Sequence, residues 1–276
     1  HPRVRRQRQM CIRDRYRMSD PIRLSTEDEQ SLSNGDFEGD WSSKTISGLI
    51  NGANIFVSRV TLTSNEPVGW SSVNAKTFSN KSNISSTYNT VPSTMKVDGK
   101  TGFGVRLRTV GWDNSAGNTA TICYHASAGK LFLGSYSFDH SNNSEMYNYG
   151  LPFTARPSSV RAQYKYTPYS GDSFKAWAII LNKENGIETE LGRGQLIKGD
   201  ALSNWTELTF PIIYTNLTKK ATHMYIVFSS SANCSENEST ESDKLKELLD
   251  KGTEVDGYTH HEGSNLYIDE VELIYE

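Results

Sequence analysis

The chain has 276 residues, of which 36% are hydrophobic and 11% aromatic, and its formal net charge is −3. This composition supplies enough apolar material for a globular protein with a real core. No run approaches the roughly 18 apolar residues that a membrane-spanning helix needs, so we expect no direct membrane insertion by this sequence.

The first 18 residues differ in composition from the rest of the chain. Residues 1–17 contain seven arginines and one aspartate, a charge of +6, so the remainder carries −9 of the total of −3. A nucleic-acid arm is one interpretation of such a run. We favour a non-native or disordered leader, because "RRQRQMCIRDR" resembles translated adaptor sequence and Met18 is a plausible start. No nucleic-acid partner is then expected.

Residues 19–29 are predicted to form a flexible lead-in. The run "MSDPIRLSTEDEQ" is polar, so it does not continue the basic segment as a secretory signal would. From residue 52 onward, short strand-like runs alternate with turn signals and helical periodicity is nearly absent. The clearest predicted strands span residues 54–64, 102–110, 119–126, 130–138, 159–168, 173–182, 204–213, 223–231 and 264–276.

Two of these strands indicate how the sheets are covered. Residues 159–168 alternate cleanly, with Val160 and Tyr164 on one side and Arg161 on the other, so one face is predicted to be wet. Residues 173–182 are apolar on both sides, which is typical of a strand that is covered on both faces. The following "KENGI" contains an Asn-Gly pair that predicts a tight hairpin.

One helical pattern interrupts this series. The segment "SDKLKELLDKG" has a leucine stripe, a serine at its start and a glycine at its end, and it predicts a short surface helix near 242–251. The two cysteines outside the leader, Cys123 and Cys234, show no metal-binding or redox spacing, and their pairing stays open. We therefore predict an all-β fold with residues 30–276 as a single domain.

The two ends of this domain carry conspicuous carboxylates. Near the beginning, "SNGDFEGDW" places Asp36, Glu38 and Asp40 around one phenylalanine. In the final strand, alternation places Asp269 on the same side as Tyr267 and several apolar residues, which is the side expected to face the core. A buried, unpaired aspartate costs several kcal/mol, so it should have a cation or strong hydrogen-bond donors as partners.

Taken together, "NGDFE" followed by a tryptophan and the final "YIDEVEL" resemble the signature of galactose-binding-like, carbohydrate-binding-module-like jelly rolls. The resemblance implies a jelly-roll β-sandwich whose first and last strands lie side by side, tied by a structural Ca²⁺. It implies Glu38, Asp269 and Asp36 as ligands, with carbonyls from the turn at 98–104 completing the oxygen shell that Ca²⁺ prefers. The alternative is that Asp36 and Asp40 form turns, Glu38 is solvated and Asp269 accepts local backbone donors.

A narrower resemblance covers the chain from about residue 33 to its end. The segments "NGDFEGDW", "EPVGWSSVN", "YGLPFTARPSSVRAQYKYTPYSGDSFKAWAIIL", "NWTELTFPI" and "GSNLYIDEVELIYE", in this order, resemble the family named "putative carbohydrate metabolism domain". That family occurs chiefly in surface and exported proteins of Bacteroidetes. The resemblance implies a glycan-related role at the cell surface, in the outer membrane or in the periplasm.

A carbohydrate site needs exposed aromatic faces with amides, carboxylates or arginine close by. The candidates are two polar loops and one arginine: Trp112, Asp113 and Asn114 in "VGWDNSAGN", Tyr147 and Tyr149 in "HSNNSEMYNYG", and Arg156 in "TARPSS". Each also has a structural interpretation, since aromatic residues fill surfaces and an arginine can anchor a turn through carbonyls. Trp70 and Trp205 are predicted to be structural. Convergence of the two loops on one face would favour binding.

Patterns typical of enzymes are missing from the sequence. There is no G-x-S-x-G, no H-E-x-x-H and no phosphate-binding glycine loop, and Glu207, an acid within a strand, is predicted to face solvent. We therefore favour a non-catalytic, glycan-binding domain of a cell-surface or exported bacterial glycan-utilisation protein. The alternatives are a structural or adhesive surface domain with a protein partner, and a glycoside hydrolase or lyase.

Overall fold

The computed structural model describes residues 28–51, 57–78, 92–112, 125–139, 141–142, 144–233, 253–255, 258–260 and 262–275. Within these ranges the protein is almost entirely β, with one short helix, α1 (Asn74–Thr77). The first strands are β1 (Trp41–Asn51), β2 (Val57–Pro67), β3 (Ser71–Ser72), β4 (Thr94–Asp98), β5 (Phe103–Trp112), β6 (His125–Ser127), β7 (Lys130–Phe132), β8 (Gly134–Asp139), β9 (Ser144–Tyr149) and β10 (Leu151–Pro152). The remaining strands are β11 (Ser159–Thr167), β12 (Phe174–Glu184), β13 (Ile187–Lys198), β14 (Leu202–Pro211), β15 (Ile213–Tyr214), β16 (His223–Ser229), β17 (Thr253–Val255), β18 (Tyr258–His260) and β19 (Glu262–Ile274).

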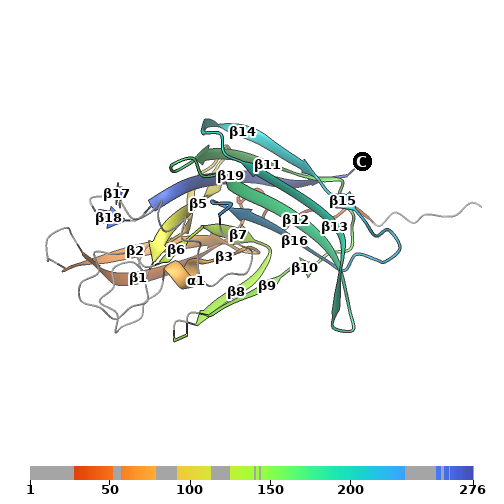
Figure 1. Ribbon diagram of the computed structural model, residues 1–276, viewed down its shortest axis with the longest axis horizontal. Coiled ribbons are helices and arrows are strands. Elements are labelled where there is room, and N and C mark those ends of the chain that lie inside the picture. The colour runs from red at the N-terminus through yellow and green to blue at the C-terminus, as the bar shows by residue number, and fades with distance from the viewer. Residues whose placement is uncertain are drawn as a thin grey trace, which may run out of the picture.

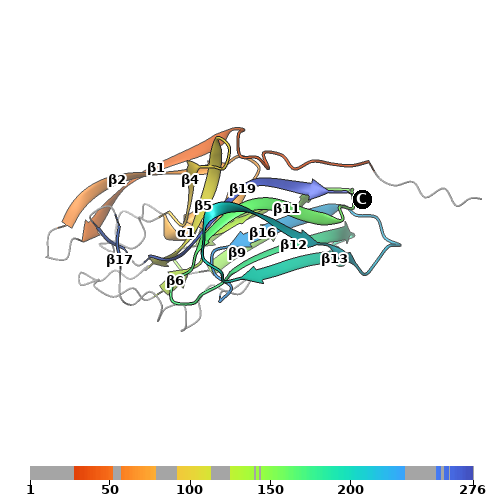
Figure 2. The ribbon, with the colours of Figure 1, turned by 90° about the horizontal axis from the view of Figure 1, so that it is seen from above.

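Two antiparallel sheets pack face to face as a jelly-roll β-sandwich (Figures 1 and 2). The seven-stranded sheet has the order β15-β13-β12-β16-β7-β3, with β10 also paired to β16. The six-stranded sheet has the order β14-β11-β19-β5-β4, with β6 paired to β5. In Figure 1, β14, β11 and β19 lie on one side of β12 and β16, and the β8–β9 hairpin lies on the other. The predicted all-β jelly-roll fold is confirmed.

The main core lies between the two sheets. The ring of Phe174 in β12 lies 5.2 Å from that of Tyr164 and 5.0 Å from that of Tyr166, both in β11. Side chains of β11 alternate between buried and partly exposed, so the wet face predicted for this strand is confirmed. The even-numbered residues of β12 therefore face the six-stranded sheet, and the odd-numbered ones face away from it.

Strand β12 is also covered on its odd-numbered side. Trp177 and Ile179 are each 1% exposed, although they point away from the six-stranded sheet. The prediction of a strand buried on both faces is therefore confirmed. The predicted hairpin after this strand is confirmed too, because Asn185 and Gly186 take the positive φ angles, 52° and 76°, that such a turn requires.

The alternation predicted for the last strand is wrong in its first half. Leu266 and Ile268 are the fully buried residues there, whereas Tyr267 is only partly buried and points outward. The reason is an irregularity beside β11, where the register jumps between Gln163↔Asp269 and Arg161↔Glu272 and Glu270 adopts a φ of 48°. Over this interval β19 has one residue more than β11. This extra residue reverses the alternation of buried and exposed side chains, so Val271 is buried as predicted.

The segment predicted as one strand over residues 130–138 is divided in two. Gly134 has a φ of 142°, and β8 leaves the sheet there to pair with β9. An added Cβ on Gly134 would lie 2.3 Å from the carbonyl oxygen of Asn148, so the pairing requires glycine at this position. The predicted polar loop that contains Tyr147 and Tyr149 is thus mostly the strand β9.

Several predictions fall outside the described residues. They are the leader at 1–18, most of the lead-in at 19–29, the helix near 242–251, both Cys123 and Cys234, and the pair Asp113 and Asn114. Trp112 is described only in its backbone, as the last residue of β5. Among the described residues, no helix has the length and apolar character to cross a membrane.

Candidate functional site

An aromatic cluster lies between the β8–β9 hairpin and the seven-stranded sheet. We call it the hairpin aromatic cluster, and it consists of Phe132, Tyr136, Tyr147, Tyr149 and Tyr225. The rings of Tyr147 and Tyr149 stack at 5.3 Å, and those of Tyr149 and Tyr225 stack at 4.8 Å. Phe132 lies 5.6 Å from Tyr147, and Tyr136 lies 4.9 Å from Tyr147. Five rings from four strands therefore form one continuous set of aromatic contacts, in which Phe132 and Tyr225 are buried and the other three rings are partly exposed.

Strand pairing explains why these rings meet. Tyr225 is opposite Ile179 in β12, and Phe132 is opposite Val227 in β16, which is itself opposite Trp177. All of these residues therefore share the face of the seven-stranded sheet that points away from the sandwich core. The hairpin covers this face with one side only, because its residues alternate between partly buried and exposed positions. Met146, on the opposite side of the hairpin, is 68% exposed.

A buried ion pair borders the cluster. The Nζ atom of Lys76 in α1 lies 2.5 Å from Oε1 of Glu145 in β9, and both side chains are only 2% exposed. The hydroxyl of Tyr136 donates a hydrogen bond to the same carboxylate oxygen at 3.2 Å. Nζ of Lys130 donates to the Tyr147 hydroxyl at 3.3 Å. These contacts fix the polar atoms that line the aromatic surface.

The electrostatics favour hydrogen bonding over proton transfer. Burial, followed by the negative charge of Glu145, raises the pKa of Tyr147 far above its ordinary value. Tyr147 therefore stays protonated and can donate or accept hydrogen bonds. Hydrolysis of a glycosidic bond requires two carboxylic groups about 5–10 Å apart. Among the described residues, Glu145 is the carboxylate that contacts the hairpin aromatic cluster. Asp139 is at an exposed position on the opposite side of the hairpin, so it does not form a catalytic pair with Glu145.

Two of the three predicted metal ligands, Glu38 and Asp269, meet at one turn, the connection between β4 and β5 in the six-stranded sheet. Oδ2 of Asp269 accepts hydrogen bonds from the backbone N–H groups of Lys100 at 2.7 Å and Thr101 at 3.3 Å. Oε1 of Glu38 accepts the N–H of Phe103 at 2.6 Å. The turn approaches both carboxylates so closely that a Cβ on Gly102 would lie 2.2 Å from the Glu38 carboxylate. The first and last segments of the domain are thereby held together at residues 99–103.

Asp269 is fully buried and has no cation beside it among the described residues. Burial raises the pKa of its carboxyl group, although three backbone N–H groups act in the opposite direction. The described residues contain no group of three or more histidine, cysteine, aspartate or glutamate side chains arranged to hold a metal. Two carboxylates on one turn are compatible with a Ca²⁺ shell completed by carbonyl oxygens, and calcium here stays a prediction.

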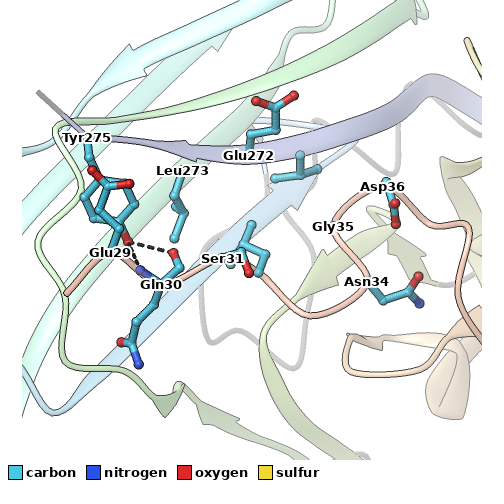
Figure 3. Close-up of a pocket in the computed structure, with 11 residues that line it drawn as sticks. Glu29, Gln30, Ser31, Asn34, Gly35, Asp36, Glu272, Leu273 and Tyr275 are labelled. Atoms are coloured by element: carbon cyan, nitrogen blue, oxygen red, sulfur yellow. Dashed lines mark hydrogen bonds between the residues drawn. The ribbon is translucent and has the colours of Figure 1, made fainter.

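Asp36, the third predicted ligand, lines a groove between the first segment and the last strand (Figure 3) and, together with Glu38, a second, smaller groove. Its Oδ1 atom accepts the N–H of Glu38 at 3.3 Å, which makes it a turn former as well as a groove residue. The groove has a volume of about 580 Å³. It is lined by Glu29, Gln30, Ser31, Leu32, Asn34, Gly35, Asp36, Val271, Glu272, Leu273 and Tyr275. Figure 3 shows the Tyr275 hydroxyl bonded to the backbone of Gln30 at one end of it.

Arg156 has a structural environment. Its guanidinium donates hydrogen bonds to the carbonyl oxygens of Asn216, at 3.2 Å, and Lys219. It also lies over the ring of Tyr214, at 5.3 Å from the centroid. The arginine therefore anchors the turn after β15, as its alternative interpretation predicted.

Of the predicted ligand-binding residues, the structure brings Tyr147 and Tyr149 into one site. Sequence reasoning missed Tyr136, Tyr225 and the Lys76–Glu145 pair. One local signal was available, because "SEMYNY" alternates between polar or exposed residues and Glu145, Tyr147 and Tyr149. Tyr225 and Lys76 join the site through long-range strand pairing and packing, which no local pattern shows.

Comparison with known proteins identifies the family. Residues 37–190, more than half of the chain, match the family model described as "Putative carbohydrate metabolism domain". The chain belongs to this family, which confirms the resemblance inferred from the motifs and gives the protein a carbohydrate-related role. No curated protein matches the chain significantly in sequence.

Solved structures share the fold. A protein from Bacteroides thetaiotaomicron described as a "putative glycoside hydrolase" superposes with a TM-score of 0.51 and 21% identity, over 84% of this chain and 71% of that one. A protein from Bacteroides vulgatus with the same description gives a TM-score of 0.50 and 20% identity, over 87% and 97% of the chains. At these identities the likeness shows the β-sandwich architecture alone.

Proposed function

We propose that this protein is a non-catalytic carbohydrate-binding domain that serves an exported or cell-surface glycan-utilisation protein, and that its ligand is a glycan. The observation that supports this proposal is the hairpin aromatic cluster. Tyr136, Tyr147 and Tyr149 are partly exposed while they pack on the buried rings of Phe132 and Tyr225. Rigid aromatic faces beside fixed polar atoms suit the C–H surfaces and hydroxyl groups of a sugar.

The hydrolase alternative has one supporting observation, the description of the two Bacteroides structures. Against it stands the chemistry of the cluster, where the described residues supply one carboxylate, Glu145, which is already paired with Lys76. A structural or adhesive role would require the tyrosines to be inaccessible to sugars. The three functions therefore differ in what happens when a glycan meets this surface: binding, cleavage or neither.

A structural Ca²⁺ at Glu38 and Asp269 is part of the proposal. Its role would be to neutralise the buried Asp269 carboxylate and to fix the turn at 99–103 against the first and last segments. Asp36 belongs to the neighbouring groove and is the least favoured of the three predicted ligands. The cation would raise the stability of the fold and take no part in sugar recognition, because the hairpin aromatic cluster lies on the far side of the other sheet.

The test is binding of the full chain to an array of neutral and acidic glycans, followed by calorimetry on any hit, with calcium and with EDTA. Tyr147→Ala should reduce the affinity at least about fivefold, since one aromatic stacking partner contributes on the order of 1 kcal/mol or more. Met146→Ala, on the opposite side of the same strand, is the matched control and should bind normally. Asp269→Asn should abolish any rise in melting temperature that calcium produces.

Three outcomes would count against the proposal. Release of reducing sugar from a bound glycan would establish the hydrolase. No binding by a folded protein would favour the structural role. An equal loss of affinity in the Tyr147→Ala and Met146→Ala variants would mean that the glycan does not bind at the hairpin aromatic cluster. The proposed calcium site is refuted, independently of glycan binding, if EDTA leaves the melting temperature of the wild-type protein unchanged.

A further inference from the structure

A row of aromatic and cationic side chains crosses the outer face of the six-stranded sheet. We call it the cross-strand row, and it consists of Trp205 in β14, Lys165 in β11, Tyr267 in β19 and Arg106 in β5. Strand pairing places Lys165 opposite Tyr267, and Tyr267 opposite Arg106. Nζ of Lys165 lies 4.5 Å from the ring centroid of Trp205 and 4.8 Å from that of Tyr267. Rings and cations therefore alternate from strand to strand.

The row faces solvent rather than the core. Its chain neighbours Tyr164, Tyr166, Leu266 and Ile268 are buried between the sheets, so alternation directs Lys165 and Tyr267 outward. All four members of the row are partly exposed. This surface is distinct from the hairpin aromatic cluster, which lies beyond the other sheet (Figure 1).

The two cations of the row differ in their partners. The guanidinium of Arg106 is engaged by the carboxylate of Glu262 and by Oδ1 of Asn265, the latter at 2.7 Å. Among the described residues, the Lys165 ammonium contacts the two rings but has neither an ion pair nor a hydrogen bond. A cation over aromatic faces keeps most of its charge available to an added anion. Lys165 is thus the charge on this face that still lacks a counterion within the described part of the chain.

Two carboxylates lie near the row on the same face. Glu272, in the next row of the same face, pairs with Arg161 at 2.6 Å. The hydrogen bond and charge of Glu272 raise the pKa of Arg161, and the charge of the exposed Glu207 adds a smaller contribution. The face therefore presents Lys165 as a local positive centre in a chain whose overall charge is negative.

We propose that the cross-strand row binds an anionic polysaccharide, of the kind whose sugar units carry carboxylate groups. Trp205 and Tyr267 lie two strands apart, about 10 Å, which is comparable with the length of a disaccharide. One sugar acid can pair with Lys165 while the adjacent rings contact its apolar C–H surface. A nucleic acid would require many phosphate-neutralising cations, and the row offers one. The inference goes beyond the proposed function and does not depend on the hairpin aromatic cluster.

The experiment compares binding of the full chain to polygalacturonate and to the same polymer after its carboxyl groups are reduced. Lys165→Met and Trp205→Ala should each weaken binding to polygalacturonate at least about fivefold, since each removes a contact worth on the order of 1 kcal/mol or more. Lys220→Met removes the same charge from an exposed loop and is the matched control. The reduced polymer should not bind, and rising salt should weaken the interaction.

Melting temperatures of all variants are measured first, so that loss of binding can be separated from loss of fold. The proposal is overturned if polygalacturonate does not bind, if Lys165→Met binds as wild type, or if the Lys220 control loses as much affinity. Stronger binding to poly-aspartate than to polygalacturonate, lost in Lys165→Met, would assign the row to an acidic protein partner and would also overturn it. Tyr147→Ala should leave this binding intact, which separates the result from the hairpin site.

Discussion

The two outer faces of the sandwich use similar residues in opposite ways. On the seven-stranded sheet, the tyrosines of the β8–β9 hairpin pack against the sheet and stay partly exposed, whereas Lys76 is buried in an ion pair with Glu145. On the six-stranded sheet, Lys165 lies between Trp205 and Tyr267 at a partly exposed surface. Composition does not distinguish the faces. Burial does, and it decides whether a lysine stabilises the fold or remains available to a ligand.

Removal of Glu145 from its buried ion pair with Lys76 should have the largest effect on stability. Glu145→Ala leaves the Lys76 ammonium buried without its carboxylate, and we expect the free energy of unfolding to fall by about 3–5 kcal/mol. Denaturant titration with circular dichroism measures the change. The double variant Lys76→Met/Glu145→Leu should recover much of the loss, because the buried ammonium is then removed together with the carboxylate that it contacts. A single variant as stable as the wild type would show that the pair is not buried in solution.

A second, smaller effect should appear at the end of the cross-strand row, where Glu262 joins Arg106 and Arg108. Burial would raise the pKa of Glu262, but the charges of Arg108 and Arg106 outweigh it and hold the pKa below its ordinary value. A lowered carboxyl pKa adds stability that is present at neutral pH and is lost as the pH falls through the folded-state pKa. Glu262→Gln should lower the free energy of unfolding by about 2 kcal/mol at pH 7.

The pH dependence is the sharper test of that prediction. The stability difference between the wild-type protein and Glu262→Gln should shrink as the pH falls below about 4, where unperturbed glutamate becomes protonated. Urea titrations at a series of pH values would follow it. A difference that stays constant from pH 7 to strongly acidic conditions would contradict the assigned role of Arg106 and Arg108.

The smallest effect on stability is expected on the outer face of the six-stranded sheet, in the cross-strand row. Lys165→Met removes a partly exposed ammonium that has no ion pair or hydrogen bond within the described residues. The free energy of unfolding should therefore change by no more than about 0.5 kcal/mol. The same denaturant titration measures it. A loss comparable with that of Glu145→Ala would mean that Lys165 is structural, and the contrast between the two faces would disappear.

Strand-like runs along the chain were enough to predict an all-β fold and the unusual strand at 173–182, whereas the jelly-roll sandwich was implied by the family resemblance. Tyr147 and Tyr149 were candidate ligand contacts because they are aromatic residues in a polar segment. The sequence pattern could not predict Tyr225 or Lys76 as their neighbours, because those contacts depend on strand order and register. The outward direction of Tyr267 was missed for another reason. A non-glycine residue at positive φ, Glu270, resets the alternation, and its sequence neighbourhood gives no sign of this.

The contacts between the two end segments also have a mechanical consequence. Gln30 is bonded to Tyr275, and further along Gly35 accepts the N–H of Val271, so the two segments run in opposite directions (Figure 3). A force that pulled the chain apart at residues 30 and 275 would reach the Gln30–Tyr275 bonds first and the Gly35–Val271 bond afterwards. Bonds loaded one after another resist less than bonds loaded together. The bonds of this seam would therefore break one after another, while at residue 275 the same force would also reach the pairing of Ile274 with Ser159 in the six-stranded sheet.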